Sequence, residues 1–196
     1  MHKIVIATHN THKLEEFRAI FAPLGIEVLG GDEVGLKDVE ETGTTFEENA
    51  LLKARHAYQQ IGIPVLADDS GLCIKALNDG PGLYSARFAK ENGGYPAVFQ
   101  AVWDKIGNNP DRSAYFKCCI AFITGPDKAD EHLFIGKMNG RIANEAKGTH
   151  LFGYDPIFIP DGYDKTCGEL EPEIKNKISH RANALKEMIA FLKEEA

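Results

Sequence analysis

The stretch that decides the fold is Pro64-Val65-Leu66-Ala67-Asp68-Asp69-Ser70-Gly71, in which an apolar run leads directly into two carboxylates. We expect a buried strand over 64–67 that enters the acid pair, and a further strand over 72–76. Neighbouring carboxylates raise each other's pKa unless a cation compensates them. Mg²⁺ is a natural compensator, because it takes one or two carboxylates together with substrate phosphates. A solvated turn is an equally good interpretation, since Asp, Ser and Gly all favour turns.

Upstream of this stretch, the N-terminus reads as strand, polar loop and helix. Residues 3–7 predict a short buried strand, residues 8–11 a turn, and residues 12–22 an amphipathic helix. This arrangement places loop amides and a helix N-terminus beside a bound phosphate, and Lys13 adds positive charge. Taken alone, the segment favours a simpler interpretation, a helix N-cap followed by a surface lysine.

The remaining pattern indicates an α/β protein. Thr44-Thr45-Phe46-Glu47-Glu48 resembles a capping box opening a helix that runs to about Gln60. The other expected elements are strands over 26–29, 114–124 and 131–136, a turn over 78–82, and helices over 96–106 and 179–193. We expect one domain over residues 1–196, with a mixed twisted sheet, flanking helices, and two lobes around a central cleft.

Composition excludes several classes of protein. The chain has 196 residues, and its formal net charge of −7 argues against a general nucleic-acid binder, because phosphate neutralisation by Lys and Arg supplies most of that affinity. No apolar run approaches the roughly 20 residues of a membrane span, and Ile4–Ala7 is too short for the core of an export signal. The four cysteines form no C-x-x-C pair, which favours free thiols in a reducing cytoplasm.

An acidic loop over 38–43 contains Glu40 and Glu41. Considered alone, these residues are best explained as a solvated charge pair. They become candidates for metal binding only if the loop faces Asp69.

A last cluster lies toward the C-terminus. Phe152-Gly153-Tyr154-Asp155-Pro156 supplies aromatic rings that can stack on a base. Lys175 follows, and His180 and Arg181 at a helix start offer hydrogen-bond donors to a base edge. Taken singly, each residue is better explained as a core aromatic or as a solvent-facing cation.

Together these segments resemble the inosine triphosphate pyrophosphatase family, the non-canonical purine NTP pyrophosphatases. Six motifs stand in the family's order and spacing over essentially the whole chain, which is a far stronger signal than any one motif. They are Ile4-Val5-Ile6-Ala7-Thr8-His9-Asn10-Thr11-His12-Lys13, Glu40-Glu41-Thr42-Gly43 with Phe46–Arg55, Leu66-Ala67-Asp68-Asp69-Ser70-Gly71-Leu72, Gly80-Pro81-Gly82-Leu83-Tyr84-Ser85-Ala86-Arg87, Phe152-Gly153-Tyr154-Asp155-Pro156-Ile157-Phe158 and Ser179-His180-Arg181-Ala182-Asn183-Ala184-Leu185.

The resemblance implies hydrolysis of ITP, dITP and XTP to the nucleoside monophosphate and pyrophosphate by an Mg²⁺-dependent homodimer, with the nucleotide in the central cleft. It implies that Asp69 accepts the proton of the attacking water and binds the metal. Glu40 would be the second acidic ligand, with Glu41 and Asp68 as near-equal alternatives. The substrate contacts that it implies are Thr8, His9, Asn10, Thr11, His12, Lys13, Lys53, Ser70, Phe152, Gly153, Tyr154, Asp155, Lys175, His180 and Arg181, with Arg87 as a helper.

The chain departs from the family pattern at two places. His9 replaces the usual glycine of the first motif, and the glycine-rich stretch before Phe152 reads Gly148-Thr149-His150-Leu151. Both departures concern affinity rather than the class of reaction.

Three alternative functions remain. A Maf-type nucleotide pyrophosphatase is disfavoured by Ser179-His180-Arg181, and a catalytically silent nucleotide-binding regulator is disfavoured by the intact Asp68-Asp69 pair. An RNA-binding module is disfavoured by the acidic balance of the chain.

Overall fold

The computed structural model describes residues 1–194, and the chain divides into two compact units. The first unit comprises Met1–Asp69, Cys118–Gly136 and the chain from Ala184 onward; the second comprises Ser70–Lys117 and Lys137–Asn183. Strand β3 (Val65–Ile74) crosses from one unit to the other at the Asp69–Ser70 peptide.

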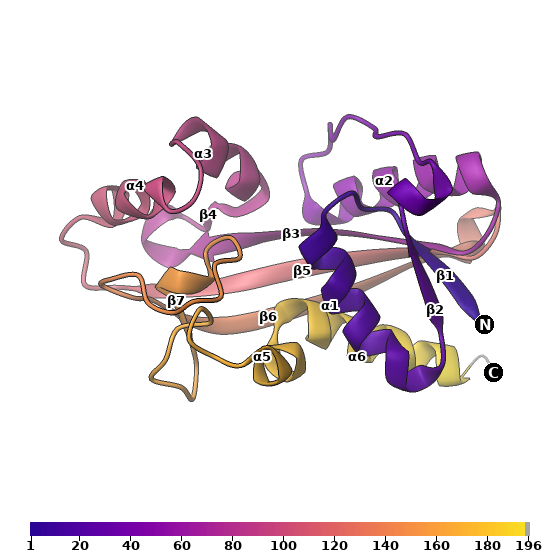
Figure 1. The fold of residues 1–196 in the computed structure, drawn as a ribbon. Coiled ribbons are helices and arrows are strands. Elements are labelled where there is room, and N and C mark those ends of the chain that lie inside the picture. The colour runs from indigo at the N-terminus through magenta and orange to yellow at the C-terminus, as the bar shows by residue number, and fades with distance from the viewer. Residues whose placement is uncertain (195–196) are drawn as a thin grey trace. The chain divides into compact units, whose positions relative to one another are not determined.

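The elements alternate between strands and helices along the chain (Figure 1). In order they are β1 (Lys3–Ile6), α1 (Thr11–Phe21), η1 (Ala22–Leu24), β2 (Glu27–Gly30), η2 (Asp32–Val34), α2 (Phe46–Ile61), β3, η3 (Lys75–Leu77), β4 (Gly80–Pro81), η4 (Gly82–Tyr84), α3 (Ser85–Glu91), α4 (Ala97–Ile106), β5 (Ser113–Ile123), η5 (Lys128–Asp130), β6 (Glu131–Ile142), η6 (Asp155–Ile157), β7 (Phe158–Pro160), α5 (Pro172–Ile178) and α6 (His180–Glu194). No helix within residues 1–194 has both the length and the apolarity to cross a membrane.

The strands form a mixed sheet in the order β2-β1-β3-β5-β6-β7, with β4 also paired to β3. Strand β1 is parallel to both β2 and β3, whereas β4 is antiparallel to β3 and β7 is antiparallel to β6. The predicted α/β class, a mixed sheet with flanking helices, is confirmed.

The core of the first unit gathers side chains from β1, β2, β5, α1 and α6 around the start of β3. Its members include Ile4, Ile6, Phe17, Phe21, Val28, Leu66, Ile120, Phe122, Leu185 and Met188. Helix α2 lies on the other side of β3 from α1 (Figure 1). It buries Ala50, Ala54 and Ala57, at the spacing of one helix face, and these small side chains allow α2 to lie close to its neighbours.

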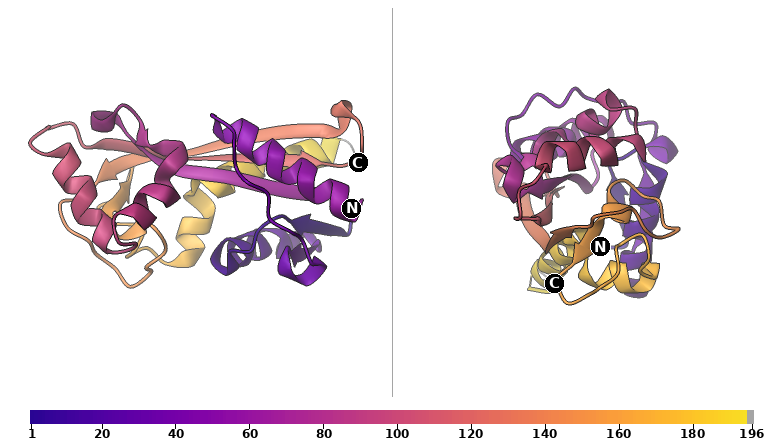
Figure 2. Two further views of the ribbon diagram at one scale, coloured as in Figure 1. Left: turned by 90° about the horizontal axis from the view of Figure 1, so that it is seen from above. Right: turned by 90° about the vertical axis from the view of Figure 1, so that its left-hand side faces the viewer.

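The second unit has its own core, formed around the far half of β3. Leu72 and Ile74 pack with Phe116 and Phe158 and with the apolar face of α4. Figure 2 shows α3 and α4 side by side in this unit. Each half of β3 is therefore held by a separate apolar cluster.

The expectation that β3 ends at the acid pair was wrong. Residues 65–74 form one strand, and Asp68 and Asp69 lie in its interior, only 3% and 7% exposed. The pair tolerates this because lysine side chains compensate the carboxylates, so no solvated turn is needed. Gly71 does not break the strand either; it lets the Gly82 carbonyl approach so closely that a Cβ atom would lie 2.1 Å from it.

Other boundaries differ for local reasons. Strand β6 continues past the expected end at Gly136 to Ile142. Its Gly140 leaves room for the neighbouring β7 strand, because a Cβ atom there would lie 2.2 Å from the Ile159 carbonyl. Lys75, expected in a strand, begins η3, and the expected turn over 78–82 includes Asn78 and Asp79 with positive φ. The short elements α3, α5, β4 and β7 were not predicted.

The expected start of α2 is confirmed with one change. Thr45 is the N-cap, and its side chain accepts a hydrogen bond from the Glu48 amide. A capping box would return the Glu48 carboxylate to the amide of the N-cap itself. Here the carboxylate accepts from the preceding amide, that of Thr44, at 2.7 Å.

We expect Gly71→Ala to lower the free energy of unfolding more than Gly25→Ala does. The new methyl group at position 71 meets backbone atoms, whereas at Gly25, with φ of +66°, a Cβ atom would have no other atom within 4 Å. Overpacking costs about 1–3 kcal/mol or more, and the left-handed conformation costs a non-glycine residue about 1–2 kcal/mol. Urea unfolding of both variants measures the difference, and equal losses would contradict the close approach at Gly71.

Candidate active site

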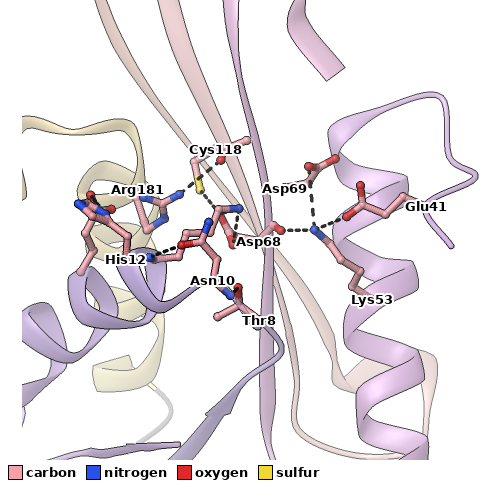
Figure 3. Close-up of polar contacts among 12 residues, drawn as sticks. Thr8, Asn10, His12, Glu41, Lys53, Asp68, Asp69, Cys118 and Arg181 are labelled. Atoms are coloured by element: carbon pink, nitrogen blue, oxygen red, sulfur yellow. Dashed lines mark hydrogen bonds and ion pairs between the residues drawn. The ribbon is translucent and has the colours of Figure 1, made fainter. Parts of the chain in front are cut away.

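The acid pair projects to both faces of β3, because successive strand residues point in opposite directions. Figure 3 shows Asp68 and Asp69 leaving the strand on opposite sides. Lys13 of α1 lies 3.3 Å from both carboxylate oxygens of Asp68, and the Cys118 thiol donates to Asp68 Oδ2 at 3.9 Å. Asp69 faces α2 and the acidic loop.

Lys53 of α2 connects the groups on this side. Its Nζ donates to the Asp68 carbonyl at 2.6 Å, lies 2.7 Å from Glu41 Oε1 and lies 4.0 Å from Asp69 Oδ1. Burial lowers the pKa of Lys53, but Asp68, Asp69 and Glu41 together raise it above its ordinary value. Lys53 is therefore a cation at neutral pH, and it compensates the acidic cluster.

Asp69 has the properties of a general base. Burial is the main cause that raises its pKa, to about 6; Lys53 opposes this and Glu41 adds to it. Asp69 Oδ2 is buried and has no hydrogen-bond partner within the described residues. A carboxylate with a pKa near neutrality and an uncommitted oxygen can accept a proton from a water molecule.

The N-terminal loop is organised by its own side chains. Asn10 is the N-cap of α1 and accepts from the Lys13 amide, while Thr8 Oγ1 accepts from the Asn10 amide. Thr11 opens the helix, and His12 Nδ1 lies 3.7 Å from Glu16. The expected N-cap is confirmed, but Lys13 is not a surface lysine, because its side chain is only 20% exposed and reaches Asp68.

The acidic loop brings one of its two glutamates to the cluster. Glu41 contacts Lys53, whereas Glu40 is exposed to solvent. The ring of His9 is turned toward Asp32 and Asp38 rather than left open. The roles of Glu40 in metal binding and of His9 in phosphate binding stay predictions.

In the second unit, the start of α6 is buried. Arg181 is 1% exposed, and its Nη2 donates to Ser70 Oγ at 3.4 Å. His180 is 6% exposed and stacks on Phe116, with the ring centroids 4.9 Å apart. The interpretation of these two residues as solvent-facing was wrong, because ring packing and a polar contact hold them inside the unit. Ser179 Oγ accepts from the Ala182 amide, as expected for an N-cap.

Within residues 152–155, Asp155 forms a polar pair with Lys175, and Tyr154 packs in the core. The buried Lys175 ammonium donates to the Asp155 carboxylate and lies 5.1 Å from the centre of the half-buried Phe152 ring. Tyr154 is 4% exposed; its hydroxyl donates to the Ser85 carbonyl, and its ring meets Tyr95 edge-on. Tyr154 therefore packs, which leaves Phe152 as the ring available for stacking. Gly153 between them adopts φ of +54°.

Sequence reasoning missed the contact of Cys118 with Asp68. Cys118 is buried in β5. The two residues are 50 positions apart, so no local pattern indicates their contact.

The acidic cluster suits a hard divalent cation. Asp69 has a buried oxygen without a partner, Glu41 is close by, and both offer the oxygen ligands that Mg²⁺ prefers. Within residues 1–194, no three His, Cys, Asp or Glu side chains gather as a complete metal site.

Comparison with known proteins assigns the family. Residues 4–191 match the model of the Ham1 family. The chain is 46% identical over 196 residues to a dITP/XTP pyrophosphatase of Oceanobacillus iheyensis, covering 98% of each chain, and 42% identical to one of Coxiella burnetii, covering 99% of this chain and 98% of the relative. The structure of the Staphylococcus aureus Ham1 protein matches with a TM-score of 0.86 at 45% identity, covering 99% of this chain and 100% of that one. The resemblance expected from the six motifs is thus confirmed, and the chain belongs to the Ham1 family.

Proposed function

We propose that this protein hydrolyses non-canonical purine nucleoside triphosphates, namely ITP, dITP and XTP, to the nucleoside monophosphate and pyrophosphate. The observation that carries the proposal is Asp69, a buried carboxylate with a pKa of about 6 and a partnerless Oδ2. The relatives named dITP/XTP pyrophosphatase support the choice of substrates.

The chemical step is a displacement at the α-phosphorus. A water oxygen forms a bond to the phosphorus as one of its protons passes to Asp69. The bond from the α-phosphorus to the bridging oxygen breaks, and its electron pair leaves with pyrophosphate. A positioned general base contributes about 10²–10⁴-fold to such a step.

The residues of the first unit bind and neutralise the triphosphate. Thr8, Asn10 and the first amides of α1 supply hydrogen-bond donors, and Lys13 and Lys53 supply positive charge in a chain whose net charge is −7. Asp69, with Glu41 or Glu40, would hold Mg²⁺. When bound, the ion reduces the charge on the phosphate oxygens and stabilises the leaving group.

The residues of the second unit bind the base. Phe152 stacks on it, and Arg181 and His180 donate toward the oxygen at C6 of hypoxanthine or xanthine, with Lys175, Asp155 and Ser70 beside them. Strand β3 joins the two sets of residues along the chain at Asp69–Ser70.

We further propose that the protein acts in the cytoplasm as a homodimer. The proposal of two chains rests on the resemblance to the family, and a light-scattering mass equal to that of one chain would contradict it.

Asp69→Asn is expected to reduce kcat by at least about 10²-fold, because an amide cannot accept the proton of water. Asp164→Asn is the matched control, since Asp164 is exposed and lies outside the proposed site; it should retain wild-type turnover. Pyrophosphate release from ITP measures both. A folded Asp69→Asn protein with wild-type kcat would remove Asp69 from the mechanism, and a wild type that binds ITP without releasing pyrophosphate would indicate a silent regulator.

In metal-free protein, the same substitution is expected to raise stability at pH 7.5. The pKa of Asp69 is raised from 3.8 to about 6 on folding, so ionised Asp69 destabilises the folded state above pH 6, and this penalty disappears as pH falls toward 3.8. A shift of about 2 units corresponds to at most about 3 kcal/mol. Urea unfolding in EDTA measures the free energy of unfolding of Asp69→Asn and of the wild type. The difference between them should shrink as pH falls from 7.5 to 4.5, and a difference that does not change with pH would argue against the raised pKa.

ITP and XTP are expected to be hydrolysed with kcat/KM at least about 10²-fold above that of ATP. Adenine carries an amino donor at C6, so Arg181 and His180 would leave unpaired donors against it. Kinetics with ITP, XTP and ATP on the wild type and on Arg181→Ala provide the measurement. Equal kcat/KM for ITP and ATP in the wild type would refute the base pocket, and an equal loss for every nucleotide in Arg181→Ala would make Arg181 a phosphate contact.

A further inference from the structure

His9, the residue that departs from the family pattern, bridges two acidic side chains. Its Nδ1 lies 2.5 Å from Asp32 Oδ1, and its Nε2 lies 3.0 Å from Asp38 Oδ1. Ionised carboxylates only accept hydrogen bonds, so a ring that donates to both of them carries protons on both nitrogens. In that state the ring is an imidazolium cation between two carboxylates.

The two partners come from different elements. Asp32 opens η2 directly after β2, whereas Asp38 begins the acidic loop that carries Glu40 and Glu41. Both carboxylates are largely exposed, at 80% and 86%, while the His9 side chain is 33% exposed. Burial does not hold the Asp38 side chain in place, whereas its pair with His9 does.

The acidic loop is anchored at its ends by hydrogen bonds from its backbone amides to side chains of α2. At one end the Lys37 amide donates to Gln60 Oε1 at 2.9 Å, and at the other the Gly43 amide donates to Asn49 Oδ1 at 2.7 Å. Between these anchors, residues 38–42 lie outside helices and strands. The pairs Asp38–His9 and Glu41–Lys53 hold this span.

Gly31 leaves space for the His9 ring. The Gly31 amide donates to the Thr8 carbonyl at 3.0 Å, and a Cβ atom on Gly31 would lie 3.2 Å from His9 Cε1. The absence of a side chain at position 31 therefore leaves room for the ring beside Gly31.

We propose that His9 is a positioning residue that clamps the acidic loop and so holds Glu41 beside Lys53 and Asp69. The catalytic consequence of the clamp rests on the proposed function; the clamp itself does not. His9, Asp38, Glu41 and Lys53 all line one cavity of about 320 Å³, so a loosened loop changes the surroundings of the catalytic cluster directly.

The clamp depends on pH. The hydrogen bond to Asp32 is the main cause that raises the pKa of His9, and the charge of Asp38 adds to it, while burial opposes both. Because the pKa is raised on folding, the charge pairing of the clamp is fully present below the ordinary pKa of histidine, as long as both carboxylates are ionised. It is lost as pH rises through the folded pKa of His9. The other charged or titratable groups lining the cavity are Lys37 and Glu41 from the loop and Lys53 and His56 from α2.

Amide hydrogen exchange of the peptide covering 37–43 tests the clamp. At pH 6, His9→Gln and Asp38→Asn should each speed its exchange about 5- to 10-fold, while the amides of α2 stay unchanged. Asp32→Asn is the matched comparison, because it removes an equal charge beside the ring and leaves the tether to the loop. It should keep the loop protected at about pH 5, where histidine is protonated even without Asp32, whereas Asp38→Asn should not. His9→Arg, a cation at every pH, should preserve protection and remove its decline at higher pH.

Wild-type exchange in His9→Gln would overturn the proposal, as would an Asp32→Asn loop that exchanges as fast as that of Asp38→Asn at about pH 5. Pyrophosphate release from ITP, measured on the same proteins, should show a lower kcat/KM for His9→Gln and Asp38→Asn. If the wild type releases no pyrophosphate while the exchange results hold, the proposed function fails and the clamp stands. If the wild type is active but His9→Gln and Asp38→Asn exchange the 37–43 amides at the wild-type rate, only the clamp proposal fails.

Discussion

The acidic cluster of the first unit depends on the ammonium group of Lys53. Asp69 and Glu41 repel each other, and burial already disfavours the charge on Asp69. Lys53 opposes both effects, because its Nζ contacts Glu41 and the Asp68 carbonyl and lies 4.0 Å from Asp69. Without that cation, a buried carboxylate would face an uncompensated neighbour, which is among the most destabilising arrangements in a protein interior.

The geometry of this contact begins in helix α2. Ala50, Ala54 and Ala57 form its buried face, so the helix packs closely, and Lys53 next to that face can extend its stem inward. A lysine supplies what the position requires, namely a long flexible stem and a compact charge with several donors. The helix thus contributes to the cluster through its small residues as well as through its charged one.

Local features were predictable because they depend on neighbours in sequence. The strand, loop and helix at the N-terminus, the cap at Thr45 and the helix after Ser179 each follow from spacing and capping residues. The unbroken β3 was not predictable, because Asp68 and Asp69 resemble a turn unless Lys13 and Lys53 are known to meet them. Those lysines lie on other elements, 55 and 15 positions before Asp68, and only the folded chain brings them to the strand.

The candidate site shows the same division. The residue types of the acid pair and of the lysines could be identified from the sequence, but not their surroundings. Tyr154 lies in a core and Arg181 is buried, although both have side chains typical of a solvent-accessible binding site. Cys118 next to Asp68 and Asp38 next to His9 are contacts between segments that no local periodicity connects.

The alternation of side chains along β3 limits how the gene can change. Asp68 and Asp69 meet different partners only because one faces each side of the strand, and a shift of one residue sends every side chain of a strand to the opposite face. Deleting or inserting a single codon between Val65 and Ala67 would therefore exchange the two aspartates even though both remain in the chain. Length variation among relatives should be absent from this strand and confined to loops, where an added residue leaves the orientation of the acid pair unchanged.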